Sequence, residues 1–184
     1  MEYEIYTHLD LFSGIGGFAL AARNTGKIKT VSFCEFDPYC HTILNKHWPK
    51  VPIINDIRQL DTARFIREHG RPWLITGGFP CQPWSVAGKR EGHRDSKNRD
   101  LWPEMFRVIS DLAPKFILGE NVPGFINLPM GIERTNSDLE KEYEVATFNI
   151  PACAVSLAHE RKRVWIIAKR KPMGNTEHSG SSTP

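Results

Sequence analysis

The chain has 184 residues, of which 40% are hydrophobic and 24% are charged, and its formal net charge is +3. These values are typical of one soluble globular domain, and no apolar run approaches the roughly 20 residues that span a bilayer. The amino terminus lacks a signal-peptide pattern, so we expect a cytoplasmic protein with reduced thiols. The four cysteines show neither CxxC pairs nor zinc-ligand spacing, which excludes a disulfide framework and predicts no metal site.

Apolar runs alternate with helical patterns along the chain in a β–α rhythm. Strands are expected at residues 5–12, 29–35, 51–54, 73–76, 115–118, 143–150 and 164–169. Helices are expected at 16–24, 38–48, 57–69 and 101–112, and a short helix and an irregular stretch follow Val122. This order predicts an α/β fold with a doubly wound, mostly parallel sheet that binds ligands at the carboxyl ends of its strands. The domain is expected to span residues 1–170, and 171–184 read as a flexible tail.

Cys81 lies in the segment Gly78-Phe79-Pro80-Cys81-Gln82-Pro83, directly after the expected strand at 73–76. A thiol at the end of a buried strand, in a loop stiffened by two prolines, suits a nucleophile. A structural cysteine in a turn is the alternative.

Phe12-Ser13-Gly14-Ile15-Gly16-Gly17 joins the first expected strand to the first helix. Glycines let backbone amides approach a ligand, and a helix amino terminus favours an anionic group. Glu35 ends the second expected strand, where an acidic side chain accepts from ribose hydroxyls, and Asp56, after the third, is placed to accept from an adenine amino group. Together they outline a pocket for an adenosine-containing ligand, although the glycine loop alone is also a tight turn and each acid alone is also a helix cap.

Glu120-Asn121-Val122 follows the fifth expected strand, so Glu120 should reach the same edge of the sheet as Cys81. That pairing suggests a nucleophile and an acid, and the alternative is a cap on the next short helix. Arg161 and Arg163 precede the last expected strand, where alternate side chains would point into the site and away from it.

The segment from Ser85 to Arg99 is rich in Gly, Ser and Asn and carries five basic and two acidic residues. It reads as a long basic loop that is either simply solvated or grips phosphates and closes over a polyanion. The candidate DNA-binding residues are Gln82, Ser85, Lys89, Arg90, Arg94 and Arg99.

These motifs, in this order, resemble those of DNA cytosine-5 methyltransferases over residues 8–169. The glycine segment from Asp10 to Gly17 resembles the family's first cofactor motif, and the segments at Cys81 and Glu120 resemble its Pro-Cys and Glu-Asn-Val motifs. Arg99-Asp100-Leu101-Trp102-Pro103-Glu104 resembles the segment between these two motifs. Arg161-Lys162-Arg163 resembles a Gln-x-Arg-x-Arg element in which His159 replaces the glutamine.

The resemblance implies a Rossmann-like fold with an antiparallel strand near the carboxyl terminus and S-adenosyl-L-methionine as cofactor. It implies that Cys81 adds to C6 of a cytosine flipped out of double-stranded DNA, that Glu120 protonates N3, and that Arg161 and Arg163 orient the base. The residues implied at the cofactor are Phe12, Ser13, Gly14, Gly16, Gly17, Glu35, Phe36, Asp56, Ile57, Pro80 and Leu101.

Members of the family normally continue past the arginine element into a target-recognition domain and two further motifs, none of which is found in this sequence. Three interpretations follow: a core that methylates DNA unaided, a subunit that needs a complementing partner, and an inactive binder of cofactor or DNA. A tRNA-directed relative is a further reading of the substrate. If the closing segment is absent, we expect apolar surface to be exposed, cofactor affinity to be weak and the chain to self-associate.

Overall fold

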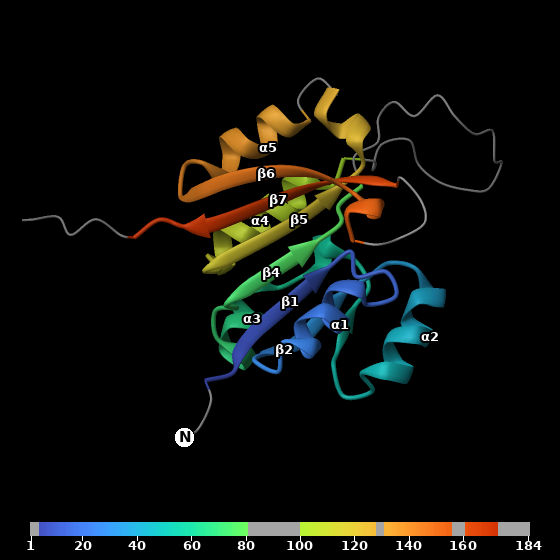
Figure 1. Ribbon diagram of the computed structural model, residues 1–184. Coiled ribbons are helices and arrows are strands. Elements are labelled where there is room, and N and C mark those ends of the chain that lie inside the picture. The colour runs from blue at the N-terminus through green and yellow to red at the C-terminus, as the bar shows by residue number, and fades with distance from the viewer. Residues whose placement is uncertain (1–3, 81–99, 128–130, 156–160, 173–184) are drawn as a thin grey trace, which may run out of the picture.

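The computed structural model describes residues 4–80, 100–127, 131–155 and 161–172 (Figure 1). One sheet contains β1 (Tyr6–Leu11), β2 (Ile28–Cys34), β3 (Ile53–Ile54), β4 (Leu74–Gly77), β5 (Phe116–Asn121), β6 (Tyr143–Pro151) and β7 (Lys162–Arg170). Their order is β3-β2-β1-β4-β5-β7-β6. The first five strands pair in parallel, and β7 runs antiparallel to both β5 and β6. The predicted doubly wound α/β fold with an antiparallel strand near the carboxyl terminus is confirmed.

Helices cover both faces of the sheet. They are α1 (Gly17–Asn24), α2 (Pro38–His47), α3 (Thr62–His69), α4 (Trp102–Leu112) and α5 (Ile132–Leu139), with short 3₁₀ turns η1 (Ile57–Gln59), η2 (Pro123–Asn127) and η3 (Ala152–Val155). In Figure 1, α1 and α2 lie in front of the sheet and α3 and α4 behind it. None of the helices in the described part of the chain is long and apolar enough to cross a membrane.

The larger hydrophobic core lies between the sheet and α4. This helix buries the residues at helical spacing Trp102, Met105, Val108, Ile109 and Leu112. They pack in the same cluster as strand residues such as Leu9, Ile75 and Ile117. A smaller cluster lies on the other face. It consists of Ala19 from α1, Phe33 from β2 and Leu44 from α2, and it packs these two helices on the sheet. The site is therefore built on a sheet that is anchored from both faces.

The single helix expected at 57–69 is wrong, because the chain forms η1 and then α3. Leu60 adopts an extended backbone (φ −68°, ψ 108°) between them. Asp56 accepts a hydrogen bond from the Arg58 amide at the start of η1, and Asp61 accepts one from the Arg64 amide at the start of α3. Two acidic caps five residues apart favour two helix starts over one continuous helix.

The irregular stretch expected before Tyr143 contains α5, and β5 extends three residues beyond its expected end at Leu118. Glycine and charged residues in 119–121 weaken the strand pattern in the sequence. Pairing with β7 overrides that weakness, since Glu120 lies opposite Trp165 and Asn121 opposite Val164.

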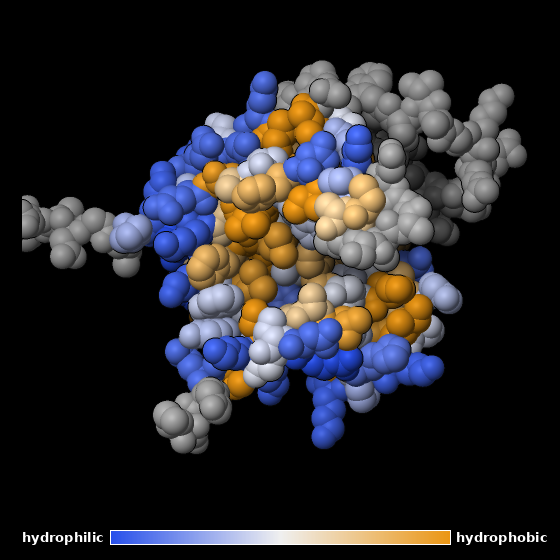
Figure 2. Space-filling view, viewed as in Figure 1, coloured by the Kyte–Doolittle hydropathy of each residue, from blue (hydrophilic) through white to orange (hydrophobic). Residues whose placement is uncertain are grey.

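Large apolar side chains are exposed where β7 and β6 meet. Phe148, Ile150 and Ile167 are 46%, 39% and 42% exposed. Cross-strand neighbours share a face, so Phe148 with its partner Trp165 and Ile167 with its partner Ala146 lie on one side of the sheet. No described helix lies over β7 and β6 on the near side in Figure 1, and Figure 2 shows hydrophobic surface there. The expectation of exposed apolar surface is met at this face.

A chain of buried polar side chains crosses β2, β1 and β4. The Thr76 hydroxyl donates to Oδ1 of Asp10 (2.6 Å), and His8 Nε2 lies 2.8 Å from the same hydroxyl. His8 Nε2 must therefore donate to Thr76, which leaves Nδ1 to accept from Thr30 (2.9 Å). Burial lowers the pKa of His8 to about 4 and raises the pKa of Asp10 to about 8. Both groups are thus held in their neutral forms at pH 7.

The raised pKa of Asp10 predicts that the free energy of unfolding falls by about 1 kcal/mol between pH 6.5 and pH 8. In this window the folded chain keeps a proton on Asp10 that the unfolded chain, with an ordinary pKa near 3.8, has released. Below pH 6.5 the lowered pKa of His8 opposes the effect, because the unfolded chain then binds a proton that buried His8 does not. Urea denaturation of Asp10→Asn should show a flatter pH dependence between 6.5 and 8. Equal slopes for the two proteins would contradict the assignment.

Candidate functional site at the carboxyl edge of the sheet

The segments that carry the predicted site residues all extend from the same edge of the sheet. The parallel strands β1, β2, β3, β4 and β5 end there, and β7 begins there because it runs antiparallel to β5. In Figure 1 this edge lies on the right, where the arrowheads of β1, β4 and β5 point. The topology therefore gathers residues that are far apart in sequence, as expected for a ligand site in this architecture.

The glycine turn between β1 and α1 has an unusual backbone. Phe12, Gly14 and Gly16 have φ angles of 51°, 54° and 87°. Ser13 fixes the turn by donating from its hydroxyl to the Asp10 carbonyl (2.7 Å) and from its amide to the Cys34 carbonyl (3.2 Å). A Cβ on Gly16 would lie 2.7 Å from the ring of Trp48. Glycine is required at this position both by the dihedral angle and by the close approach of the indole.

Glu35 ties the glycine turn to the turn after β2. Its Oε2 accepts from the Gly14 amide (2.6 Å), and its Oε1 accepts from the amides of Phe36 (2.9 Å) and Asp37 (2.8 Å). Asp37 in turn caps α2 by accepting from the Tyr39 amide. Glu35 thus links two loops through hydrogen bonds, and Asp37, not Glu35, caps α2. The amide of Gly14, expected to face a ligand, already donates to Glu35.

Asp56 caps η1 and is held by Arg58. The guanidinium of Arg58 donates to both carboxylate oxygens, with Nη2 2.6 Å from Oδ2. This interaction is the main reason why the pKa of Asp56 lies below its usual value. Ile57, next in the chain, buries its side chain in the larger core. The carboxylate of Asp56 is therefore ionised and fixed in orientation at the end of β3.

The segment that leads to Cys81 is fastened by Asn121. The buried side chain of Asn121 donates from Nδ2 to the Phe79 carbonyl (3.1 Å) and accepts from the Val122 amide (2.9 Å). The ring of Phe79 packs on Trp102 and Phe125, with centroids 5.1 Å and 5.4 Å apart. Sequence reasoning assigned no role to Asn121 or Trp102. A buried amide at the end of an apolar strand was the signal for Asn121, because such a group needs partners.

Glu120 and Arg163 form an ion pair at the start of β7. Arg163 Nε lies 2.5 Å from Oε1 of Glu120, and the two side chains are only 21% and 26% exposed. The other oxygen, Oε2, faces Gly78, where a Cβ would lie 3.1 Å away. Glu120 lies within β5 and not at the start of η2, so the cap interpretation is wrong for the contacts described. The structure brings the acid beside the backbone that leads to Cys81.

The remaining site residues divide into described and undescribed groups. Phe36 is 67% exposed beside Glu35, Gly17 begins α1, Pro80 is exposed and Leu101 precedes α4. Arg161 is exposed directly before β7, and its carbonyl accepts from the Ala152 amide. Outside the described residues lie Cys81, Gln82, Ser85, Lys89, Arg90, Arg94 and Arg99.

A second cysteine, Cys34, also lies at this edge. Cys34 is buried at the end of β2, and burial raises the pKa of its thiol to about 12, so it stays protonated and unreactive. Among the described residues no group of His, Cys, Asp and Glu is arranged to hold a metal ion.

Residues 6–183 match the family model of C-5 cytosine-specific DNA methylases. The chain is 34% identical over 171 residues to Type II methyltransferase M.PspPI of Psychrobacter sp. (strain TA137), covering 90% of this chain and 40% of that protein. It is 34% identical over 185 residues to Type II methyltransferase M1.ScrFI of Lactococcus lactis subsp. cremoris, covering 97% and 46%. The chain thus spans less than half the length of these relatives.

Solved structures of similar fold include the S. pombe Dnmt2 methyltransferase, with a TM-score of 0.75 and 24% identity over 92% of this chain and 52% of that one. The Spodoptera frugiperda DNMT2 mutant E260A/E261A/K263A has a TM-score of 0.74 and 23% identity, covering 90% and 50%. At these identities the likeness shows the fold alone.

Gly16→Ala should destabilise the chain more than Gly26→Ala, although both glycines have positive φ angles. A Cβ at Gly26 meets nothing within 4 Å, so that variant should lose only about 1–2 kcal/mol for the left-handed backbone. At Gly16 the clash with Trp48 should add about 1–3 kcal/mol of overpacking. Urea denaturation of both variants measures the difference. Equal losses would show that Trp48 moves aside without cost.

Proposed function

The chain belongs to the C-5 cytosine-specific DNA methylase family, and from this premise we propose that it transfers a methyl group from S-adenosylmethionine to C5 of cytosine in DNA. The observation that carries the proposal is the Glu120–Arg163 pair beside Gly78, three residues before Cys81. A carboxyl group there lies at the base of the segment that bears the nucleophile. The glycine turn, Glu35 and Asp56 line the same edge of the sheet.

Cys81 is the proposed nucleophile. Its thiolate forms a bond from Sγ to C6 of cytosine, and the electron pair of the C5–C6 double bond shifts toward C5 and the ring nitrogen N3. C5 thereby becomes nucleophilic enough to take the methyl group. After the transfer a base removes the C5 proton, the Sγ–C6 bond breaks, and the aromatic ring is restored. The anchor from Asn121 to Phe79 fixes the described backbone that leads to Cys81.

Glu120 is the proposed acid, protonating N3 as the thiolate adds and taking the proton back on elimination. Gly78 leaves Oε2 uncovered by a side chain, and Arg163 fixes the other oxygen. An arginine that donates to Oε1 orients the carboxyl group with Oε2 free to face the base. Arg163 thus acts through Glu120, and Arg161 is proposed to contact the base or a nearby phosphate.

S-adenosylmethionine supplies an electrophilic methyl group when it is bound. The proposed pocket runs along the turns after β1, β2 and β3. Glu35 is proposed to accept from the ribose hydroxyls, the exposed ring of Phe36 to lie against the adenine, and Asp56 to accept from the adenine amino group. The other proposed contacts are Phe12, Ser13, Gly14, Gly16, Gly17, Ile57, Pro80 and Leu101.

The basic segment from Ser85 to Arg99 is proposed to contact the DNA. A thiol at the edge of the sheet does not reach C6 within a stacked duplex, so the target cytosine has to be flipped out. Positive charge directly after Cys81 suits the phosphates on either side of the flipped base. Gln82, Ser85, Lys89, Arg90, Arg94 and Arg99 are the proposed contacts.

Incubation with tritiated S-adenosylmethionine and DNA containing 5-fluorocytosine should give a radiolabelled protein–DNA band on a denaturing gel. Fluorine at C5 blocks the proton loss that releases Cys81, so the adduct persists. Cys81→Ala should abolish the band, and Glu120→Gln should slow its formation by about 10²–10⁴-fold. Cys153→Ala, which removes an exposed cysteine elsewhere, is the matched control and should leave the band unchanged. A band that survives Cys81→Ala would overturn the assignment of the nucleophile, and no band with the wild type would show that these residues do not methylate DNA unaided.

We further propose that recognition of a particular DNA sequence requires a further polypeptide region, supplied by a complementing subunit or by additional chain. The relatives are more than twice as long as the part of them that this chain covers. The apolar face at Phe148, Ile150 and Ile167 suits contact with such a region.

The exposed apolar face predicts that the isolated chain self-associates. Sedimentation velocity should show oligomers whose fraction rises with protein concentration. Ile167→Thr should reduce that fraction, because it removes exposed apolar surface from the face. Leu20→Thr is the matched control, since Leu20 on α1 has nearly the same exposure, 44% against 42%. Equal reductions, or a wild type that stays monomeric, would argue against this face as the contact surface.

A further inference from the structure

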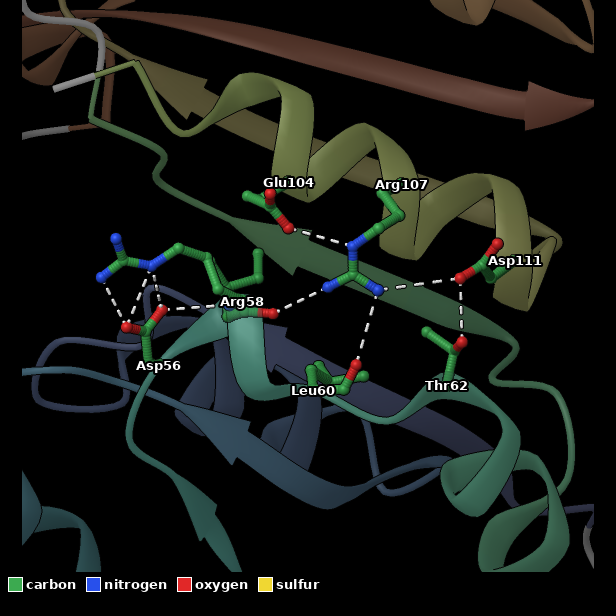
Figure 3. A network of polar contacts seen from close by, with 8 residues as sticks. Asp56, Arg58, Leu60, Thr62, Glu104, Arg107 and Asp111 are labelled. Carbon is green, nitrogen blue, oxygen red and sulfur yellow. Dashed lines mark hydrogen bonds and ion pairs between the residues drawn. The ribbon is translucent and has the colours of Figure 1, made fainter. Parts of the chain in front are cut away.

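The outer side of α4 carries a row of charged residues that faces η1 and the start of α3 (Figure 3). Glu104, Arg107 and Asp111 recur at spacings of three and four, so they lie on one face of the helix. Glu104 Oε2 accepts from Arg107 Nε (3.0 Å), and Asp111 Oδ2 lies 3.7 Å from Nη1. The Asp111 carboxylate also accepts from the hydroxyl of Thr62, the first residue of α3 (2.8 Å). The two acids hold the guanidinium in a fixed orientation.

Arg107 uses its remaining donors on the backbone of the Asp56–Leu60 turn. Nη2 donates to the Ile57 carbonyl (2.9 Å), and Nη1 donates to the Leu60 carbonyl (3.5 Å). The side chains of Ile57 and Leu60 are buried, so these carbonyls belong to a segment that is anchored in the core. Arg58 fixes the Asp56 carboxylate within the turn, and Arg107 fixes the turn against α4. Figure 3 shows the guanidinium of Arg107 bridging the helix and the turn.

The same helix reaches the segment that precedes Cys81. Trp102, at the first position of α4, packs on the ring of Phe79 and donates from its indole nitrogen to Asp138 (3.0 Å). One rigid helix therefore contacts the base of the catalytic segment at its amino end and the turn of Asp56 through Arg107. The spacing between the two is set by the length of α4 from Trp102 to Arg107.

We propose that Arg107 is a positioning residue for the adenine end of the cofactor. It holds the Asp56–Leu60 turn in the position in which the Asp56 carboxylate contacts the adenine amino group. Arg107 does not touch the cofactor itself. This inference rests on the proposed function, because it assumes that S-adenosylmethionine binds along the turns after β1, β2 and β3.

The test compares two ligands that differ at the 6-position of the base, where Asp56 reads the amino group, and in the proton that the 6-oxo base carries on N1. S-adenosylhomocysteine carries the adenine amino group, and S-inosylhomocysteine carries a carbonyl oxygen in its place. Titration calorimetry of the wild type should show tighter binding of S-adenosylhomocysteine by roughly tenfold, because a carboxylate attracts the amino group and repels the carbonyl. In Arg107→Met the ratio of the two affinities should fall to nearly one. Arg107→Lys, which keeps one donor near the Ile57 carbonyl, should restore part of the preference.

Arg64→Met is the matched control. Arg64 also pairs with a carboxylate on a helix surface, that of Glu68, but it lies on α3 away from the turn. It should leave the preference for the adenine ligand unchanged. A variant that is only less stable binds both ligands more weakly by the same factor, so the ratio separates positioning from general destabilisation.

A normal preference in Arg107→Met would overturn the positioning role and leave the proposed function intact. A wild type that binds neither ligand, even in the millimolar range, would overturn the proposed cofactor site and the inference with it. A wild type that binds both ligands equally would show that Asp56 does not read the adenine amino group, and would overturn the inference and that one proposed contact while leaving the proposed methyl transfer intact.

Discussion

Six residue pairs join β5 to β7, from Phe116 and Lys169 at one end to Asn121 and Val164 at the other. Opposed residues share a face of the sheet, so this register sends Glu120 and Arg163 to one side, where they pair, and Asn121 to the other, where it holds the Phe79 carbonyl. A slip of one residue would exchange the two faces and separate the acid from its arginine. The Glu120–Arg163 ion pair and the anchor of the segment before Cys81 therefore depend on the same set of backbone hydrogen bonds.

The side of the edge at which we propose the cofactor binds depends on a different constraint: one carboxylate accepts hydrogen bonds from several backbone amides. Glu35 accepts from three amides in two turns, which links the end of β1 to the start of α2. An open glycine turn offers its amides to an anionic ligand, but here the Gly14 amide is already occupied. In the proposed function, recognition along this turn then falls to the remaining lone pair of Glu35, to Phe36 and to the turn at Asp56. The site is preorganised by contacts within the chain.

The sequence predicts the order of strands and helices because their hydrophobic periods are clear and because Gly and Pro mark the ends. It fails where tertiary contacts outweigh local preference. Asp56 and Asp61 are both ordinary polar residues in a helical pattern, and only their cap hydrogen bonds separate η1 from α3. Likewise, Gly119 and Glu120 disfavour a strand until β7 pairs with them.

Site residues show the same division. The position of Glu120 at the site is predictable, because it follows the fifth expected strand and the carboxyl ends of parallel strands meet at one edge of the sheet. Its pairing with Arg163 is not, because the register of β7 is a long-range property. Arg107 carries no motif, and nothing in the sequence connects it with carbonyls 47 and 50 residues away. Residues that act through backbone atoms of distant segments leave little signal in a single sequence.

The two faces of the sheet differ in how completely they are closed, and Glu120 and Arg163 lie on the more open face, which they share with Trp165 and Ile167. Behind the sheet one continuous core runs from Ile57 through α4 to Ala168, so the turn of Asp56 and the strands of Glu120 and Arg163 belong to the same packed unit. In front, the cluster of Ala19, Phe33 and Leu44 covers only the β1–β2 side. The edge-on contact between Phe18 and Trp165 marks where α1 reaches β7. Beyond it, toward β6, the face is apolar and exposed. A protein region that covers this face would gain apolar burial without disturbing the core behind the sheet.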